Sequence, residues 1–269
     1  MSGPDVVPLL ELAEFDIPDP EEADGPVARW EANDGIELVG YRANGTRWIA
    51  IRGLAAFRFD PTGEVAASAI GGSEQAMRDA WVRSVLPLVV QARGTQVLHA
   101  SAVAGPSGVV ALCGTSTAGK STVAAALQAQ AYRVVADDAL AFVVTDGAAQ
   151  ALTLPFRLRL RPASAAHLEL PPIAEQGGGG ERLPLAAIVL LEPGAADGDG
   201  PRSVLVSPPE AVGALMPHAY CFALDEGKGE LVRAYAALTG SVVVRRLSFP
   251  RELEQLAGTV EHVKALLDG

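Results

Sequence analysis

Residues 112–138 read LCGTSTAGKSTVAAALQAQAYRVVADD, and this stretch decides the fold class. Within it, Gly114 to Ser121 fits the P-loop pattern G-x-x-x-x-G-K-[ST] in full. An apolar segment at 109–113 precedes the loop, and an Ala-rich segment at about 120–131 follows it. A glycine-rich turn that matched the pattern by chance would not be expected between a strand and a helix. The order strand, loop, helix therefore predicts a loop that holds a polyphosphate.

The loop residues have separate expected roles. Main-chain N–H groups and the positive end of the following helix face the phosphates, while Lys120 bridges the β- and γ-phosphates. The Ser121 hydroxyl joins the shell of a Mg²⁺ ion. The residues expected to contact the bound phosphates are Gly114, Thr115, Ser116, Thr117, Ala118, Gly119, Lys120, Ser121 and Thr122.

Two adjacent carboxylates, Asp137 and Asp138, follow the next strand-like segment, RVVA at 133–136. A strand end beside a P-loop is where a Mg²⁺ ligand belongs, and one carboxylate would suffice for a generic NTPase. The second can accept a proton from an attacking hydroxyl. The alternative is a pair of solvated turn acids. No D-x-x-G or N-K-x-D motif follows the loop, which weakens a GTPase interpretation.

Composition limits the classes of partner. The chain has 269 residues, 49% of them hydrophobic, and a formal net charge of −11. An acidic surface repels phosphate backbones and anionic lipids, so neither nucleic acid nor a membrane is the expected partner. The N-terminus lacks the basic start and apolar block of a signal peptide, and Cys113 and Cys221 are expected to be reduced packing residues. A cytoplasmic protein is the expectation.

Three regions follow from the patterns. Residues 1–27 are expected to form an acidic arm, 28–94 a small β-rich unit with a connecting helix, and 95–269 the catalytic domain. Asn44-Gly45 predicts a hairpin turn, and residues 61–63 predict a second one. Sheet and helix segments mix throughout the rest of the chain, so the predicted class is α/β with a small antiparallel N-terminal part.

A helix is predicted after residue 72, with Ser73 as its N-cap. Pro87 is expected to kink this helix or end it early. Its apolar stripe consists of Met77, Trp81, Val85 and Val89.

Several charged side chains have two open interpretations. The alternating arginines of 157–161 share one face of a strand and either hold an acidic substrate or a phosphate, or form a solvated face. Glu192, at the end of a buried strand, is either a second acidic group of the site or an ordinary loop acid. His99 is either a core histidine or a residue of the phosphate site. The arginines are Arg157, Arg159 and Arg161.

Residues 95–140 resemble the catalytic domain of HPr kinase/phosphorylase, which has a histidine in the strand before its P-loop and Ala-Asp-Asp after the first helix. Here these are His99, Lys120 and Asp137-Asp138. The closer likeness is to the diverged HPr-kinase-like serine kinases of peptide maturation, including lasso-peptide kinases. The resemblance implies a P-loop kinase core with a mixed sheet, of the HPr kinase/PEP carboxykinase type.

The resemblance also implies ATP-dependent phosphorylation of a serine on a peptide or small protein, with ATP and Mg²⁺ as cofactors. Asp137 and Ser121 would hold the metal, Asp138 would act as the base, and His99 would line the phosphate site. Two positions depart from the family, which usually has Gly where Thr117 stands and often Glu where Thr122 stands. Its glycine- and asparagine-rich C-terminal signature is missing, so HPr as substrate and the reverse phosphorylase reaction are not expected.

Alternatives to a peptide kinase stay open at this point. They are a P-loop NTPase or phosphorylase whose nucleophile is water or phosphate, and a nucleotide-binding module without catalysis. The sequence also leaves a homo-oligomer open.

Overall fold

The computed structural model describes residues 7–31, 36–171, 173–176, 179–194, 200–222 and 228–269. The chain divides into two compact units, and each is described by itself. The first comprises Met1–Thr95 and Tyr220–Leu231, and the second comprises Gln96–Ala219 and Val232–Gly269. The segment Tyr220–Leu231, which the sequence places within the catalytic domain, thus belongs to the first unit.

The first unit contains a six-stranded sheet in the order β1-β6-β5-β4-β3-β2. The predicted turn at Asn44-Gly45 is confirmed, and both residues have positive φ, 53° and 76°. The second predicted hairpin is confirmed between β5 and β6. The strands are β1 (Leu10–Leu12), β2 (Ala28–Glu31), β3 (Glu37–Ala43), β4 (Thr46–Ile51), β5 (Ala55–Phe59) and β6 (Val65–Ala69).

The sheet is not purely antiparallel, because β1 pairs with β6 in parallel. β1 comes from the predicted acidic arm, so part of that arm is a strand of the sheet. The arm is also held by Tyr41, whose hydroxyl donates to the Pro18 carbonyl over 2.8 Å, and by Phe15, which packs edge-on against Trp48. Apolar and aromatic side chains among the acids thus dock the described part of the arm.

One interrupted helix completes the first unit as α1 (Glu74–Ala80), a π-helical turn at Trp81–Val85, and α2 (Leu86–Ala92). Ser73 caps it as predicted, since its hydroxyl accepts the Ala76 N–H. Pro87 does not end the helix. The π-helical turn directly before it provides the altered spacing that a proline without an N–H requires. All four residues of the predicted apolar stripe are buried, namely Met77, Trp81, Val85 and Val89.

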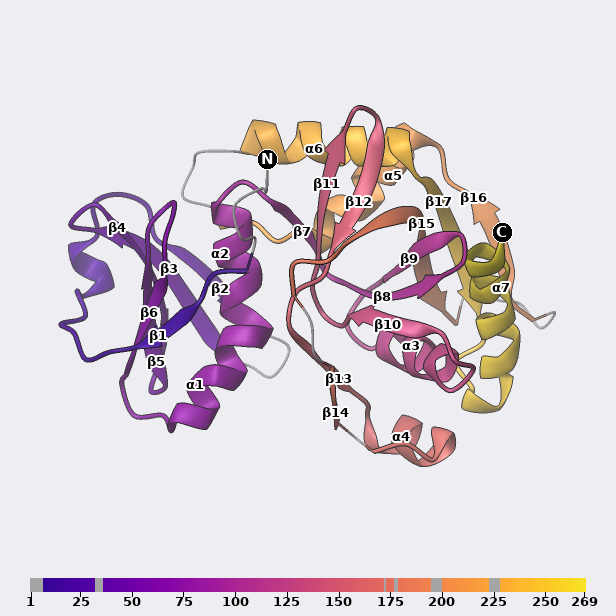
Figure 1. Ribbon diagram of the computed structural model, residues 1–269, viewed down its shortest axis with the longest axis horizontal. Helices are drawn as coiled ribbons and strands as arrows, with labels where there is room; N and C mark the ends of the chain where they lie inside the picture. Colours follow the sequence, from indigo (N-terminus) through magenta and orange to yellow (C-terminus); the bar gives the residue numbers. More distant parts are fainter. Residues whose placement is uncertain (1–6, 32–35, 172, 177–178, 195–199, 223–227) are drawn as a thin grey trace. The chain divides into compact units, whose positions relative to one another are not determined.

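The second unit is built on a nine-stranded sheet (Figure 1). Seven strands follow the order β10-β8-β9-β15-β12-β11-β7, while β17 pairs with β15 and β16 pairs with β17. A separate two-stranded sheet pairs β13 with β14. The strands are β7 (Gln96–Leu98), β8 (Ala100–Gly105), β9 (Gly108–Cys113), β10 (Arg133–Ala136), β11 (Leu140–Thr145), β12 (Ala148–Leu152), β13 (Phe156–Arg159), β14 (Ile173–Gln176), β15 (Arg182–Pro193), β16 (Arg202–Leu205) and β17 (Val243–Phe249).

Strand directions decide where the loop and the aspartates lie. β9, β15 and β17 run parallel, and β10 has the same direction because β8 lies antiparallel between β10 and β9. The carboxyl ends of β9 and β10 therefore meet at one edge, where β8 begins. The mixed α/β class predicted from the sequence is confirmed.

Helices cover this sheet. α3 and α7 pack against each other and against β8 and β9 (Figure 1). Their buried side chains, Val123, Leu127, Val260, Val263 and Leu267 among them, share one core with the strands. The helices are α3 (Lys120–Gln128), α4 (Pro162–Leu168), α5 (Pro208–Leu215), α6 (Lys228–Ser241), which belongs to the second unit from Val232 on, and α7 (Leu256–Asp268), with short 3-10 turns at Met216–His218 and Leu253–Gln255.

The predicted strand over QVLHASAVA is two strands, β7 and β8, which are separated by a bend at His99. β7 pairs with β11, whereas β8 pairs with β9 and β10. His99 therefore stands where the chain passes from one part of the sheet to another, and this bend places its ring at the edge that carries the loop.

Candidate nucleotide-binding site

The Gly114–Gly119 loop joins the carboxyl end of β9 to the first residue of α3. Gly114 is required by space, because a Cβ there would lie 2.8 Å from the Cβ of Ala118 and 3.0 Å from the carbonyl oxygen of Leu191. Thr117 and Gly119 both have positive φ, 74° and 94°. The loop therefore curls over the N-terminus of α3, where unpaired N–H groups and the helix dipole favour an anion.

Lys120 is folded into this curl. Its side chain is buried, and Nζ donates to the carbonyl oxygens of Gly114 and Thr115 over 3.0 and 3.2 Å. Burial lowers the pKa of the ammonium, while the negative charge of Asp138 acts in the opposite direction. An ammonium that is buried against two neutral carbonyl oxygens gains from an anion that enters the loop.

The carboxylate of Asp137 is held by three hydrogen bonds. Oδ1 accepts hydrogen bonds from the hydroxyls of Ser101 (2.6 Å) and Ser121 (2.8 Å), and Oδ2 accepts the backbone N–H of Arg159 (3.2 Å). Burial raises the pKa of this carboxyl to about 6, and the neighbouring charge of Asp138 adds to the rise, whereas the three hydrogen bonds oppose it. The carboxylate is thus held in place although ionising it is costly.

Asp138 has different surroundings from Asp137. Its φ is 93°, in the left-handed region, where the backbone turns sharply. Its carbonyl oxygen lies 2.9 Å from Nδ1 of His99, and its charge acts on Lys120. One carboxylate therefore faces Ser121, while the other lies in the electrostatic surroundings of Lys120 and His99.

Two imidazoles stand beside the lysine. The backbone N–H of His99 donates to the carbonyl oxygen of His218 over 2.7 Å. Burial and the charge of Lys120 lower the pKa of both rings. Neutral rings beside a cation can accept or donate hydrogen bonds to a phosphate without adding repulsion between positive charges.

Sequence reasoning missed three of these groups. Ser101 could have been found, because it lies two residues after His99 in an extended segment and so shares its side of the chain. His218 and the Arg159 N–H come from distant segments, and no local pattern marks either. The structure brings together the loop, Lys120, Ser121 and the two aspartates.

The remaining candidates have specific surroundings. The hydroxyl of Thr122 donates to Ser164 of α4 over 3.0 Å, which turns it toward that helix. The side chains of Thr115, Ser116 and Thr117 are exposed. Glu192 forms an ion pair with Arg246 at 3.1 Å, which favours its interpretation as an acid outside the phosphate loop.

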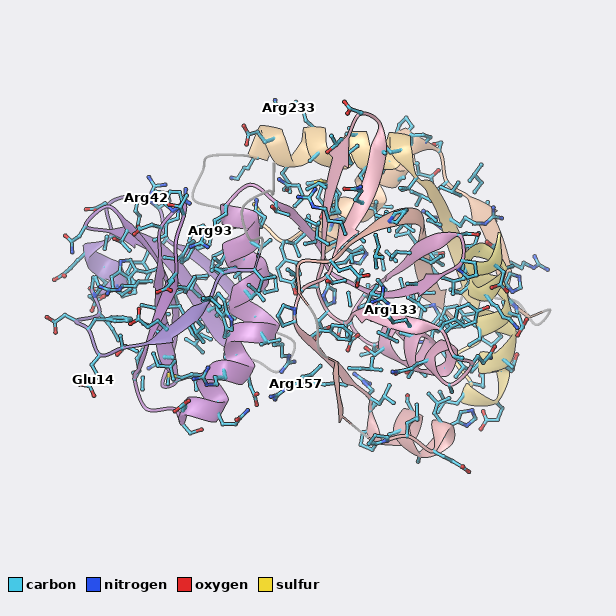
Figure 2. All side chains as sticks on the ribbon, in the orientation of Figure 1. Glu14, Arg42, Arg93, Arg133, Arg157 and Arg233 are labelled. Carbon is cyan, nitrogen blue, oxygen red and sulfur yellow. The ribbon has the colours of Figure 1, made fainter. Side chains whose placement is uncertain are left out.

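The alternating arginines are placed by β13. Arg157 and Arg159 are half-buried on one face of this strand, and Arg157 can be located in Figure 2. Phe156 and Leu158 occupy the other face and pack into the core around α3. Arg161 follows the strand as the N-cap residue of α4.

The oxygen atoms of Ser121 and Asp137 fit a Mg²⁺ ion that also binds a nucleotide better than a metal ion held by protein alone. Among the described residues, no group of three or more His, Cys, Asp or Glu side chains is arranged to hold a metal ion. Mg²⁺ usually takes one or two protein ligands and completes its shell with phosphates and water. Ser121 and Asp137, whose oxygens are adjacent, supply two such ligands.

Comparison with known proteins adds little. No model of a protein family matches the sequence, and no curated protein matches it either. A solved structure of the HPr(Ser) kinase/phosphatase from Coxiella burnetii aligns over 64% of this chain and 97% of its own, with 13% identity and a TM-score of 0.36. So distant a likeness assigns neither family nor activity, and the resemblance to lasso-peptide kinases stays a prediction. In the described part of the chain, every helix is too short or too polar to cross a bilayer.

Proposed function

We propose that this protein is a Mg·ATP-dependent kinase that phosphorylates a serine of a peptide or small protein. The observation that carries the proposal is the 2.8 Å hydrogen bond from the Ser121 hydroxyl to Oδ1 of Asp137. It joins the residue after the loop lysine to the carboxylate at the end of β10, and these are the two groups that hold Mg²⁺ in P-loop enzymes. The resemblance of residues 95–140 to HPr-kinase-like proteins supports a serine acceptor.

The chain's residues have distinct roles in the proposed reaction. The loop amides and Lys120 bind the β- and γ-phosphates, and Ser121 and Asp137 hold the metal. When bound, Mg²⁺ neutralises charge that develops on the phosphate oxygens. Asp138 takes the proton of the serine hydroxyl as the oxygen–phosphorus bond forms and the bond to the β-phosphate oxygen breaks. ADP and phosphoserine are the products.

Transfer of label from γ-labelled ATP to serine-containing peptides tests the proposal. Wild-type protein should transfer label, and Asp138→Asn should lose most of this activity while still binding ATP. Release of phosphate at the same rate with and without peptide would favour the NTPase alternative. ATP binding without turnover would favour the non-catalytic module. A role in lasso-peptide tailoring requires, in addition, that a precursor peptide accepts the label.

A further inference from the structure

His218 is a residue beside the loop that the sequence did not predict. It ends the 3-10 turn that follows α5, and Ala219 after it is extended. An isolated antiparallel bridge pairs Ala219 with Leu98, so His218 lies across from His99. The backbone N–H of His99 donates to the carbonyl oxygen of His218 over 2.7 Å. This bond and the bridge hold the two histidines side by side, although they come from distant segments.

The contacts of His99 show which part of the site His218 adjoins. Nδ1 of His99 lies 2.9 Å from the carbonyl oxygen of Asp138, the carboxylate proposed as the base. The ammonium of Lys120 is close enough for its charge to act on both imidazoles. His218 therefore stands beside the loop lysine, next to the histidine that contacts Asp138.

The imidazole of His218 is suited to bind an anion. The residue is half-buried, and in the part of the chain that the structure describes no hydrogen bond ends at its ring nitrogens. Burial, together with the charges of His99 and Lys120, lowers the pKa of the ring, so it is neutral at pH 7. A neutral imidazole has one N–H donor, and phosphate oxygens are acceptors. The ring can thus donate to a phosphate without placing a second cation beside Lys120.

We propose that His218 determines specificity for a nucleoside triphosphate, because its ring donates a hydrogen bond to the terminal phosphate. The inference rests on the proposed kinase function. In that reaction the terminal phosphate lies between Lys120, which binds its oxygens, and Asp138, which takes the proton of the acceptor. His218 adjoins both groups. The loop amides hold the inner phosphates of a diphosphate equally well, so they do not make this distinction.

The proposed bond also has a consequence for turnover. Transfer removes the terminal phosphate from the nucleotide, so ADP lacks the group that His218 contacts. The site therefore binds the triphosphate more tightly than the diphosphate by the contribution of this hydrogen bond, and release of ADP becomes easier after transfer.

The test compares two nucleotides in three variants. Titration calorimetry is carried out with Mg²⁺ and either ADP or a non-hydrolysable ATP analogue. His218→Ala should weaken binding of the analogue about tenfold, because a hydrogen bond to a charged group is lost, and should change binding of ADP less than about twofold. His218→Gln keeps a neutral N–H donor and should restore most of the affinity. His262→Ala, at an exposed position of α7, is the matched control and should change neither affinity.

Contact with the phosphate has a direct readout in NMR spectra of protein labelled at its four histidines. His218→Gln identifies the ring signal of His218, because that signal disappears. The ATP analogue with Mg²⁺ should shift this signal more than ADP does, and the signal of His262 should stay in place with both nucleotides.

The outcomes separate this inference from the kinase function. Equal weakening of ADP and analogue binding in His218→Ala, or a Gln variant as weak as the Ala variant, would show a structural role and overturn the inference. Unchanged analogue affinity in His218→Ala would overturn it as well, while label transfer by the wild type would still support a kinase. A wild-type protein that binds neither nucleotide would refute the kinase function, and the inference with it.

Discussion

The hydroxyl of Ser121 donates to Oδ1 of Asp137 over 2.8 Å, which links the first turn of α3 to the end of β10. The same oxygen accepts Ser101 from β8. Three elements that are separated in the sequence thus converge on one carboxylate oxygen. This convergence is the arrangement expected of the proposed site for a metal-bound nucleotide.

Removing the Ser121 hydroxyl should weaken Mg·nucleotide binding. In Ser121→Ala, the affinity for Mg·ATP is expected to fall about tenfold, because one oxygen ligand and one hydrogen bond are lost. Ser121→Thr retains a hydroxyl and serves as the control. Titration calorimetry with a non-hydrolysable ATP analogue measures both, and equal affinities for the Ala variant and wild type would contradict the metal role.

Nucleotide affinity should depend on pH through Asp137. The pKa of its carboxyl is raised to about 6, so below that pH the group is protonated and loses the charge that attracts Mg²⁺. Mg·ATP affinity is expected to fall about tenfold per pH unit below pH 6 and to level off above it. Asp137→Asn should bind weakly at every pH. A pH-independent affinity of the wild type between pH 5 and about 8 would exclude this role for Asp137.

Ser101 is predicted to position the Asp137 carboxylate. Ser101→Ala removes a 2.6 Å hydrogen bond to a buried charge, so the pKa of Asp137 should rise above its wild-type value. The pH at which the affinity for Mg·ATP begins to fall should rise with it. Loss of a bond to a charged group costs about 1.5–3 kcal/mol of unfolding free energy.

The stability loss in Ser101→Ala has a defined pH dependence. The folded-state pKa of Asp137 is raised above its unfolded value, so the native state binds the proton more strongly and stability falls as pH rises from about 4 to about 6. In Ser101→Ala this fall should continue to higher pH. Urea unfolding should therefore show a larger difference between variant and wild type at pH 8 than at pH 5, and Ser101→Thr should restore both properties.

Asp138 is predicted to act in catalysis more than in binding. Asp138→Asn should lower kcat by about 10²- to 10⁴-fold, which is the usual contribution of a positioned general base. Asparagine tolerates left-handed backbone, so the φ of 93° should be retained. Steady-state kinetics with a peptide acceptor give kcat, and near-normal turnover in this variant would remove Asp138 from the mechanism.

Thr117 carries backbone strain that glycine should relieve. A left-handed φ costs an L-residue about 1–2 kcal/mol, which glycine avoids. The unfolded chain is more flexible with glycine, and this offsets about 0.5–1 kcal/mol of the gain. Thr117→Gly should therefore raise the free energy of unfolding by about 0.5 kcal/mol and Tm by about 2 °C. Thr115→Gly, also exposed but not at positive φ, should lower both.

Local patterns predicted the loop, its helix, the aspartate pair and the two N-terminal hairpins, because each depends on residues close together in sequence. The parallel pairing of β1 with β6 was not predicted, since acidic residues around Leu10 and Leu12 hide a short strand pattern. The Arg159 N–H and His218 reach the site from remote segments, and tertiary packing alone brings them there. The break at His99 was likewise invisible, because β7 and β8 share one continuous apolar pattern.

The sequestration of Lys120 has a practical consequence for chemical labelling. The chain contains only two other lysines, Lys228 and Lys264, and neither is buried. Brief treatment with an amine-acylating reagent should modify those two first, whereas Lys120 reacts only when its ammonium leaves the loop carbonyls. The rate at which the peptide that contains Lys120 is acylated, followed by mass spectrometry, would then report how often the lysine leaves the two loop carbonyls.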